Sequence, residues 1–207
     1  RYSVFDYAAT VGAMVALSVI SALVGANVGL PGYFIVTLGV LVAIPACMLL
    51  GFTIERIAYR PLRNAPRLAP LITAIGVSIV LQQLAMIFWG RNYHAFPPIL
   101  PTTGRDIVGA HITDVQIVII LLALSIMAGL MLLVNRTRLG RAMRATAENP
   151  QIAGLMGVNI NVIISATFLI GSALAAVAGV MVSANYSIAH YHMGFILGLK
   201  AFTAAVL

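Results

Sequence analysis

The stretch Val115–Val134, VQIVIILLALSIMAGLMLLV, decides the fold class of this chain. It contains no Lys, Arg, Asp or Glu over its 20 residues. A helix of that length rises about 30 Å, which matches the hydrocarbon core of a bilayer. Because lipid offers no partners for backbone N–H and C=O groups, a segment buried there must satisfy them internally. The stretch therefore predicts a transmembrane α-helix.

Similar apolar runs lie on both sides of this stretch. The complete runs span residues 7–24, 33–54, 71–89 and 162–184, and a further run begins at Met193 and continues to Leu207. Only 8% of the residues are charged, whereas a typical soluble domain has about 25%. We expect an all-α, polytopic transmembrane helical bundle with at least five complete spans and a truncated sixth segment. Residues 1–207 would form a single domain, a fragment without its C-terminus.

The positive charges are concentrated between the apolar runs. Eight of the 12 Lys and Arg residues fall in two segments, which we call the first arginine loop (residues 55–69) and the second arginine loop (residues 135–161). Clustered Arg and Lys mark cytoplasmic loops, and the two spans between these loops place both on one side. A nucleic-acid patch would need a soluble face to carry it. The net charge of +7 therefore indicates membrane orientation and lipid contact, with no nucleic-acid partner.

The second arginine loop is predicted to contain a short amphipathic helix. Arg138, Arg141, Ala145 and Glu148 have suitable spacing, and Pro150 interrupts the pattern. An apolar continuation follows, with Ala153, Leu155 and Met156 ahead of Gly157. Two interpretations remain open from the residues alone. The helix either lies on the membrane surface, held by anionic lipid, or docks into a soluble partner.

This loop resembles the cytoplasmic coupling loop of LivH-like permeases, the membrane subunits of branched-chain amino acid ABC transporters. The family pattern is R-x-G-R-A-x-R-A-x-A-E followed by A-x-L-x-G-x-N, and Arg138–Glu148 and Ala153–Asn159 match it. The segment Ile54–Gln83, IERIAYRPLRNAPRLAPLITAIGVSIVLQQ, resembles the family's I-E-R-x-A-Y-R-P-L-R motif and the helix after it. Gly194–Leu207, GFILGLKAFTAAVL, is similar to the family's G-x-K-A-F-T-A-A-V-L.

The resemblance implies a permease subunit of an ABC importer for branched-chain, apolar amino acids in the bacterial inner membrane. It implies a second related permease subunit, two ATPase subunits and a periplasmic amino-acid-binding protein as partners. It also implies that the second arginine loop contacts the ATPases. The coupling residues would be Arg138, Gly140, Arg141, Arg144, Ala145, Glu148, Ala153, Leu155 and Gly157.

The chain itself is not expected to be an enzyme or to hold a cofactor. It has no GxxxxGK[ST] element, the phosphate cradle of many ATPases, so the partner subunits would bind ATP. Two alternatives remain: an importer of urea or short amides from the same permease group, and a secondary transporter that works without ATPases. The second usually needs intramembrane acids or histidines for ion coupling, and the complete spans offer none.

Polar and small residues within the spans give further candidates. Gln82 and Gln83 in the third span bond between helices or line the translocation pathway, and the two side chains point about 100° apart. Lys200 either extends to the interface or lies on the pathway. Small residues recur at every fourth position of the fifth span and predict a helix-packing stripe. This stripe consists of Gly171, Ala175, Gly179 and Ser183.

The four histidines, His94, His111, His190 and His192, are all predicted to lie in outer loops. The spacing of His190 and His192 suits an extended segment. No cysteine and few carboxylates accompany them, so we expect ordinary loop histidines and no metal site.

Overall fold

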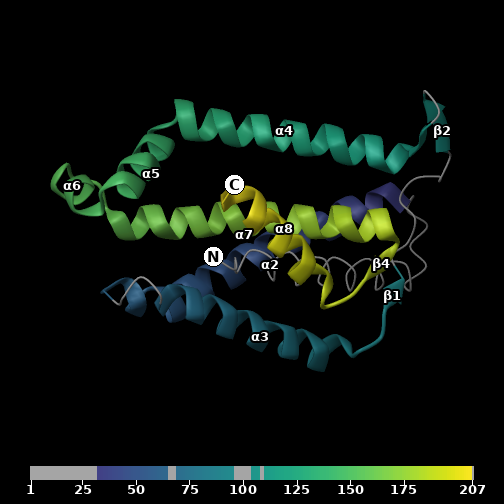
Figure 1. Cartoon of the computed structure of the whole chain (residues 1–207), viewed down its shortest axis with the longest axis horizontal. Helices are drawn as coiled ribbons and strands as arrows, with labels where there is room; N and C mark the ends of the chain where they lie inside the picture. Colours follow the sequence, from purple (N-terminus) through teal and green to yellow (C-terminus); the bar gives the residue numbers. More distant parts are fainter. Residues whose placement is uncertain (1–31, 65–68, 96–103, 108–109, 207) are drawn as a thin grey trace. The chain divides into compact units, whose positions relative to one another are not determined.

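The computed structural model describes residues 32–64, 69–95, 104–107 and 110–206 (Figure 1). Helix α2, Gly32–Ile54, continues through a π-helical turn at Glu55–Tyr59 and a 3₁₀ turn at Pro61–Asn64. The remaining elements follow in the order α3 (Ala69–Trp89), β1 (His94–Ala95), β2 (Gly104–Ile107), β3 (Ala110–Thr113), α4 (Asp114–Arg136), α5 (Arg138–Glu148), α6 (Pro150–Leu155), α7 (Ile160–Tyr186), β4 (Ile188–Ala189) and α8 (Met193–Val206).

Among the described residues, four helical segments are long and apolar enough to cross a membrane, and they confirm the polytopic helical fold. They are Thr37–Tyr59, Ile72–Trp89, Val115–Arg136 and Ile160–Tyr186. The predicted runs 33–54, 71–89, 115–134 and 162–184 lie at these places. The predicted span at residues 7–24 lies outside the described residues. The 14 residues of α8 rise about 21 Å.

The first helical segment extends further than the apolar pattern indicated. The sequence assigned residues 55–59 to the first arginine loop, whereas the structure continues the helix through them as a π-helical turn. The Arg60 N–H donates to the Glu55 carbonyl at 2.8 Å and closes this turn. The Glu55 side chain is buried, and the Arg56 guanidinium lies 5.9 Å from the Phe52 ring centroid. A membrane-spanning helix can therefore continue through charged residues at its end. A boundary placed at the last residue of the apolar run is then too early.

The chain divides into two compact units, residues 1–99 with 169–207 and residues 100–168. In the described part of the first unit, most of the buried apolar side chains are small. They include Ala43, Cys47, Ala74, Ala85 and Ala176. Large apolar side chains such as Leu41, Ile72 and Phe88 are exposed. Small residues let helix backbones approach each other, while large apolar ones suit contact with lipid.

Helix α7 buries one face within the first unit. Ser172, Ala175, Ala176, Gly179, Val180 and Ser183 are its buried residues. Their spacing of three and four residues places them along one side of a helix. Three members of the predicted packing stripe, Ala175, Gly179 and Ser183, belong to this face, and Gly171 is half-buried. Close approach of another helix backbone to the stripe stays a prediction.

The buried face of α7 gives a stability prediction. Ala176 is 1% exposed, so Ala176→Leu should force overpacking and cost about 1–3 kcal/mol. Ala178 lies on the exposed side of the same helix, and Ala178→Leu should change little. Thermal unfolding of the purified protein in detergent measures both. Equal melting temperatures for the two variants would contradict the assignment of the packed face.

The segment between the predicted spans 71–89 and 115–134 contains short strands. In the second unit β2 and β3 form an antiparallel hairpin with Gly104 opposite Thr113 and Ile107 opposite Ala110. The hairpin leads directly into α4, where the Thr113 N–H donates to the Gln116 side-chain oxygen at 3.3 Å. In the first unit β1 pairs with β4, with His94 opposite Ala189. Strands of two to four residues are too short for alternation of apolar residues to reveal them.

Candidate functional site: the second arginine loop

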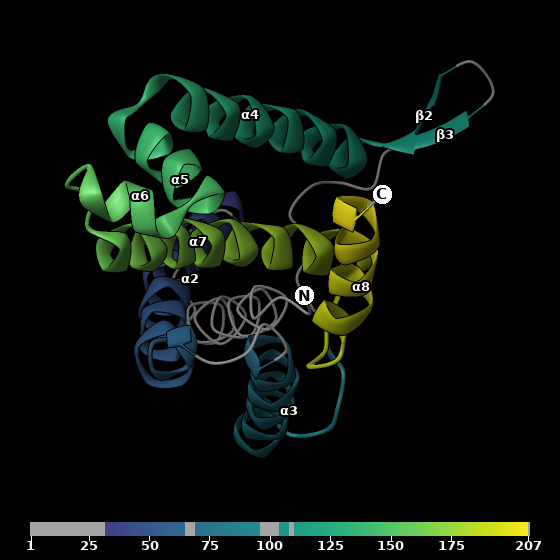
Figure 2. The same cartoon turned by 60° about the vertical axis from the view of Figure 1, so that its left-hand side comes forward.

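A single residue, Thr137, connects α4 to α5. Its hydroxyl donates to the Leu133 carbonyl at 2.6 Å and accepts from the Gly140 N–H at 3.0 Å. Helix termini leave backbone N–H and C=O groups without intrahelical partners. The Thr137 side chain binds one such region at each side, a carbonyl at the end of α4 and an N–H at the start of α5. The chain turns sharply here, and α5 leads directly from α4 into α6 (Figure 2).

Gly140 allows α5 to pass close to the end of α4. The residue is buried, and a Cβ atom at this position would contact the backbone of Leu133 and Val134 at less than 3.0 Å. Real Cβ atoms essentially never approach backbone atoms this closely. Since the obstructing atoms are backbone and not the end of a flexible side chain, the two helices would have to separate. Gly140 therefore fixes the geometry of the α4–α5 junction.

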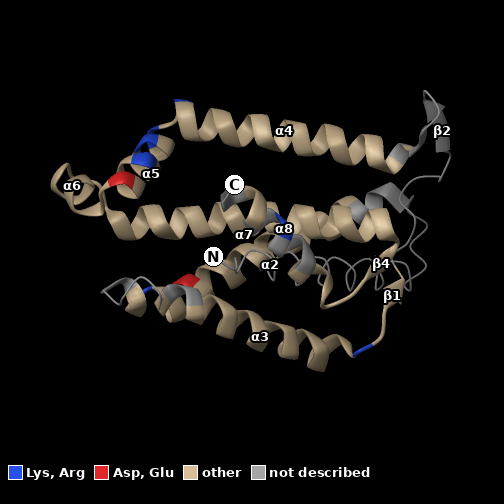
Figure 3. Cartoon of the chain, in the orientation of Figure 1, with Lys and Arg blue, Asp and Glu red and all other residues tan. Residues whose placement is uncertain are grey.

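Helix α5 presents a basic surface. The side chains of Arg138, Arg141 and Arg144 are exposed, and Figure 3 shows positive charge on α5 and at the adjoining end of α4. Arg144 donates to the Asn135 side-chain oxygen at 3.3 Å, which draws one guanidinium back toward α4. Thr146 lies on the buried side and donates to the Ala142 carbonyl at 2.8 Å. The amphipathic helix predicted from the sequence is confirmed.

Pro150 has a different role from the one expected. The sequence pattern suggested that it interrupts a helix, whereas it occupies the first turn of a new one, α6. Proline suits this position because it has no N–H to leave without a partner. The side-chain oxygen of Asn149 accepts from the N–H groups of Gln151 and Ile152 at 3.0 and 3.2 Å. Asn149 thus caps α6.

The end of α6 is set by Gly157, whose φ of +85° favours glycine. The N–H of Val158 donates to the carbonyl of Ala153 at 3.0 Å, and that of Gly157 donates to Gly154 at 3.1 Å. Ala153 is only 3% exposed. These bonds close the loop compactly before α7 begins.

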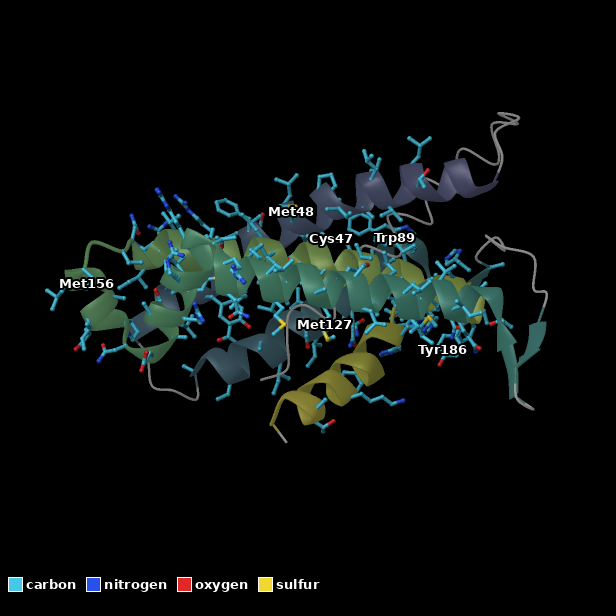
Figure 4. The ribbon with its side chains drawn as sticks, turned by 90° about the horizontal axis from the view of Figure 1, so that it is seen from above. Cys47, Met48, Trp89, Met127, Met156 and Tyr186 are labelled. Atoms are coloured by element: carbon cyan, nitrogen blue, oxygen red, sulfur yellow. The ribbon has the colours of Figure 1, made fainter. Side chains whose placement is uncertain are left out.

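Three large apolar side chains are exposed at the end of α6, and we call them the apolar tip. Ile152 is 57%, Leu155 87% and Met156 81% exposed, and Figure 4 shows Met156 pointing away from the ribbon. An exposed apolar group beside charged residues suits contact with a protein or a membrane. The apolar tip and the arginines of α5 thus form one candidate binding surface on the second arginine loop.

The structure separates the predicted coupling residues into two groups. The exposed group provides contact atoms and consists of Arg138, Arg141, Arg144, Ala145, Glu148, Leu155 and Gly157. Gly140 and Ala153 are buried, so they shape the loop and do not themselves present a surface. Ile152 was missed as a surface residue, and Met156 was recognised only as apolar. The available signal was their position ahead of a glycine, in the apolar continuation that follows the arginine-rich helix.

The candidate pathway residues differ in exposure. Gln82 is buried at 9% exposure, whereas its neighbour Gln83 is exposed, as expected for adjacent positions on a helix. Lys200 is exposed on α8. A role for these three residues in a translocation pathway stays a prediction.

The segment that contains His190 and His192, expected to be extended, is only partly so. Strand β4 ends at Ala189, and His192 lies in a turn before α8. Among the residues that the structure describes, no three or more His, Cys, Asp or Glu side chains are grouped to hold a metal ion.

Comparisons with known proteins identify the family of the chain. The model of a family described as the permease component of branched-chain amino acid transport systems matches residues 4–207. The chain is similar to the high-affinity branched-chain amino acid transport permease BraD of Pseudomonas aeruginosa, with 47% identity over 76% of this chain and 52% of the relative. It is also similar to the LivH permease of Escherichia coli K12, with 40% identity over 95% of this chain and 65% of the relative.

The chain therefore spans about half to two thirds of the length of these relatives. No solved structure matches it. The family match covers nearly the whole sequence, and the helical segments that are long and apolar enough to cross a membrane agree with it. We conclude that this multi-pass membrane protein chain belongs to the family of permease components of branched-chain amino acid transport systems.

Proposed function

We propose that this chain is part of a permease subunit of an ABC importer that moves branched-chain, apolar amino acids across the bacterial cytoplasmic membrane. The family match over residues 4–207 carries this proposal. The names of BraD and LivH support it, since both are described as high-affinity branched-chain amino acid transport permeases. ATP would be bound and hydrolysed by two partner ATPase subunits. A second related permease and a periplasmic binding protein would complete the importer.

In this proposal the second arginine loop is the surface that contacts an ATPase subunit. Its exposed arginines and apolar tip supply charged and apolar contacts in one short segment. Closure of the ATPases on ATP would move α5, and the movement would pass to α4 through Thr137 and Gly140. The other end of the loop leads into α7, so both flanking spans are connected to the docking surface.

The proposed substrates fit the chemistry of the spans. A branched-chain amino acid combines an apolar side chain with a zwitterionic backbone. A path lined by apolar and small residues and by a few hydrogen-bonding groups would let it pass without holding it tightly. Gln82, Gln83 and Lys200 are the candidates for those polar groups. Selectivity would then reside mainly in the binding protein.

Uptake of labelled leucine by proteoliposomes tests the function. The vesicles hold the full-length permease with its ATPases and binding protein, and ATP is supplied only on the side of the ATPases. We expect uptake that requires ATP and is competed by valine but not by urea. Uptake that ignores ATP would indicate a secondary transporter, and competition by urea alone would indicate an importer of amides. Either result would refute the proposal.

A further inference from the structure

One group of side chains outside the second arginine loop joins two segments of the first unit, residues 93–94 and residues 190–192. We call it the histidine clasp, and it consists of Tyr93, His94, His190, Tyr191 and His192. The short β1–β4 pairing joins the chain after α3 to the link between α7 and α8. The His190 ring stacks on Tyr93 with centroids 4.4 Å apart and lies 4.2 Å from Tyr191. His190 is therefore the central ring of the clasp.

Hydrogen bonds define which nitrogen of His190 carries the proton. The backbone N–H of His192 donates to Nδ1 of His190 at 3.3 Å, so this nitrogen acts as an acceptor and must be unprotonated. In a neutral imidazole the hydrogen then lies on Nε2. A proton added to Nδ1 would face the N–H of His192. This hydrogen bond, which supports the turn before α8 together with the bond from the Met193 N–H to the His190 carbonyl, would be lost.

The electrostatic surroundings of His190 also oppose a positive charge. Burial lowers the pKa of His190 from its ordinary value of 6.5, and the neighbouring His192 and His94 lower it further. A hydrogen bond with the backbone of Arg91 acts in the opposite direction and does not outweigh them. The tyrosine rings would attract a cation, but the net effect favours the neutral imidazole.

No carboxylate on the elements of the clasp compensates for such a charge. The segments that meet here are α3 with residues 90–95, α7, residues 187–192 and α8, and none contains Asp or Glu. Their titratable side chains near the clasp are Arg91, Tyr186 and the clasp residues themselves, and Lys200 lies further along α8. His94 has its own contact, with Nε2 2.9 Å from the Trp89 carbonyl oxygen. On these described elements, protonation of His190 would therefore add charge near Arg91 without a carboxylate to balance it.

We propose that the histidine clasp is a proton-sensitive contact between the end of α3 and the α7–α8 link. The contact is closed while His190 is neutral and opens when Nδ1 of His190 takes up a proton. Above the ordinary histidine pKa, His190 is neutral in both the closed and the open state, so protonation does not weaken closure there. As the pH falls below about 6.5 the open state binds the proton more readily, and closure is progressively lost. The end of α3 then separates from the α7–α8 link. The proposal holds whatever solute the chain transports.

Distance measurement between spin labels tests the clasp without relying on transport. Asn92 and Asn185 are exposed and flank it. Nitroxide labels on Asn92→Cys and Asn185→Cys, in the full-length protein in nanodiscs with Cys47→Ala and no other reactive cysteine, report the separation of α3 from α7. We expect a narrow distance distribution at about pH 7.5 and loss of the narrow peak at about pH 5. An unchanged distribution at both pH values would overturn the proposal.

Variants of His190 separate its protonation from general effects of pH. His190→Phe keeps the stacked ring but has no Nδ1 and takes up no proton, so its distance distribution should be the same at both pH values. His190→Lys carries a charge at both, so the narrow peak should be absent even at about pH 7.5. His111→Phe, on strand β3 of the other unit, is the matched control and should respond as the unsubstituted protein does. A pH response that survives in His190→Phe would refute the assignment to His190.

Discussion

Gly140→Ala is expected to reduce solute-stimulated ATP hydrolysis by about tenfold or more, although it adds a single methyl group. A loss of this size corresponds to about 1.4 kcal/mol, which lies within the cost of about 1–3 kcal/mol for overpacking. The new Cβ would meet the backbone of Leu133 and Val134. Because a helix backbone cannot yield as a side chain can, α5 must move away from α4. The ATPase activity of the reconstituted complex measures the effect.

Gly154→Ala is the matched control for this substitution. It lies in the same loop, and its Cβ would meet only the Ile160 side chain, at the ordinary contact distance of 3.5 Å. Hydrogen exchange of residues 137–148 supplies a readout that does not depend on the proposed function. Faster exchange is expected in Gly140→Ala and not in Gly154→Ala. If the two variants behave alike in both measurements, the inference that α5 lies tightly against the α4 backbone at Gly140 is wrong.

Leu155→Asp is the second substitution with a large expected effect. Leu155 is 87% exposed, so the change should leave folding and membrane insertion intact. If the apolar tip binds an ATPase subunit as a central contact, the substitution should cost at least about 2 kcal/mol of binding, or about 30-fold in affinity. Affinity of the detergent-solubilised permease for the isolated ATPase subunit measures this directly.

Detergent solution also separates docking from attachment to the membrane surface. A loop that merely lies on lipid would lose nothing in this assay, because no bilayer is present. Gln151→Asp places the same charge on an exposed position of α6 outside the apolar tip, and it should bind almost normally. Equal affinities for Leu155→Asp and Gln151→Asp would exclude the apolar tip as the docking contact.

The sequence was sufficient to predict the spans that the structure describes, because lipid imposes length and hydrophobicity together. The helix in the second arginine loop was equally predictable from the spacing of its arginines. The sharp junction at Thr137 was not, since it depends on a hydroxyl that bonds to two helix ends. The buried position of Gly140 arises only when α5 passes across α4. A sequence motif shows that a glycine is present, whereas the structure shows which backbone it accommodates.

The outer segments were the least predictable part. The strands of residues 94–95 and 188–189 pair across more than ninety positions of sequence, and their short length gives no periodic signal. The histidine clasp depends on this pairing, so the spacing of His190 and His192 alone could not reveal it. The different exposure of Gln82 and Gln83 was expected from helix geometry. The side chains that cover Gln82 could not be identified from its own neighbours in the sequence.

The one-residue link between α4 and α5 has a mechanical consequence. Because the link is one residue long and α5 lies directly against the end of α4 at Gly140, we expect the two helices to turn together as one bent lever. Helix α4 has 23 residues and is about 34 Å long, so turning the lever by about 10° would carry its far end through about 6 Å. A displacement of that size exceeds the radius of a helix backbone. If a partner displaces α5, a small movement there would therefore become a larger movement at the far end of α4.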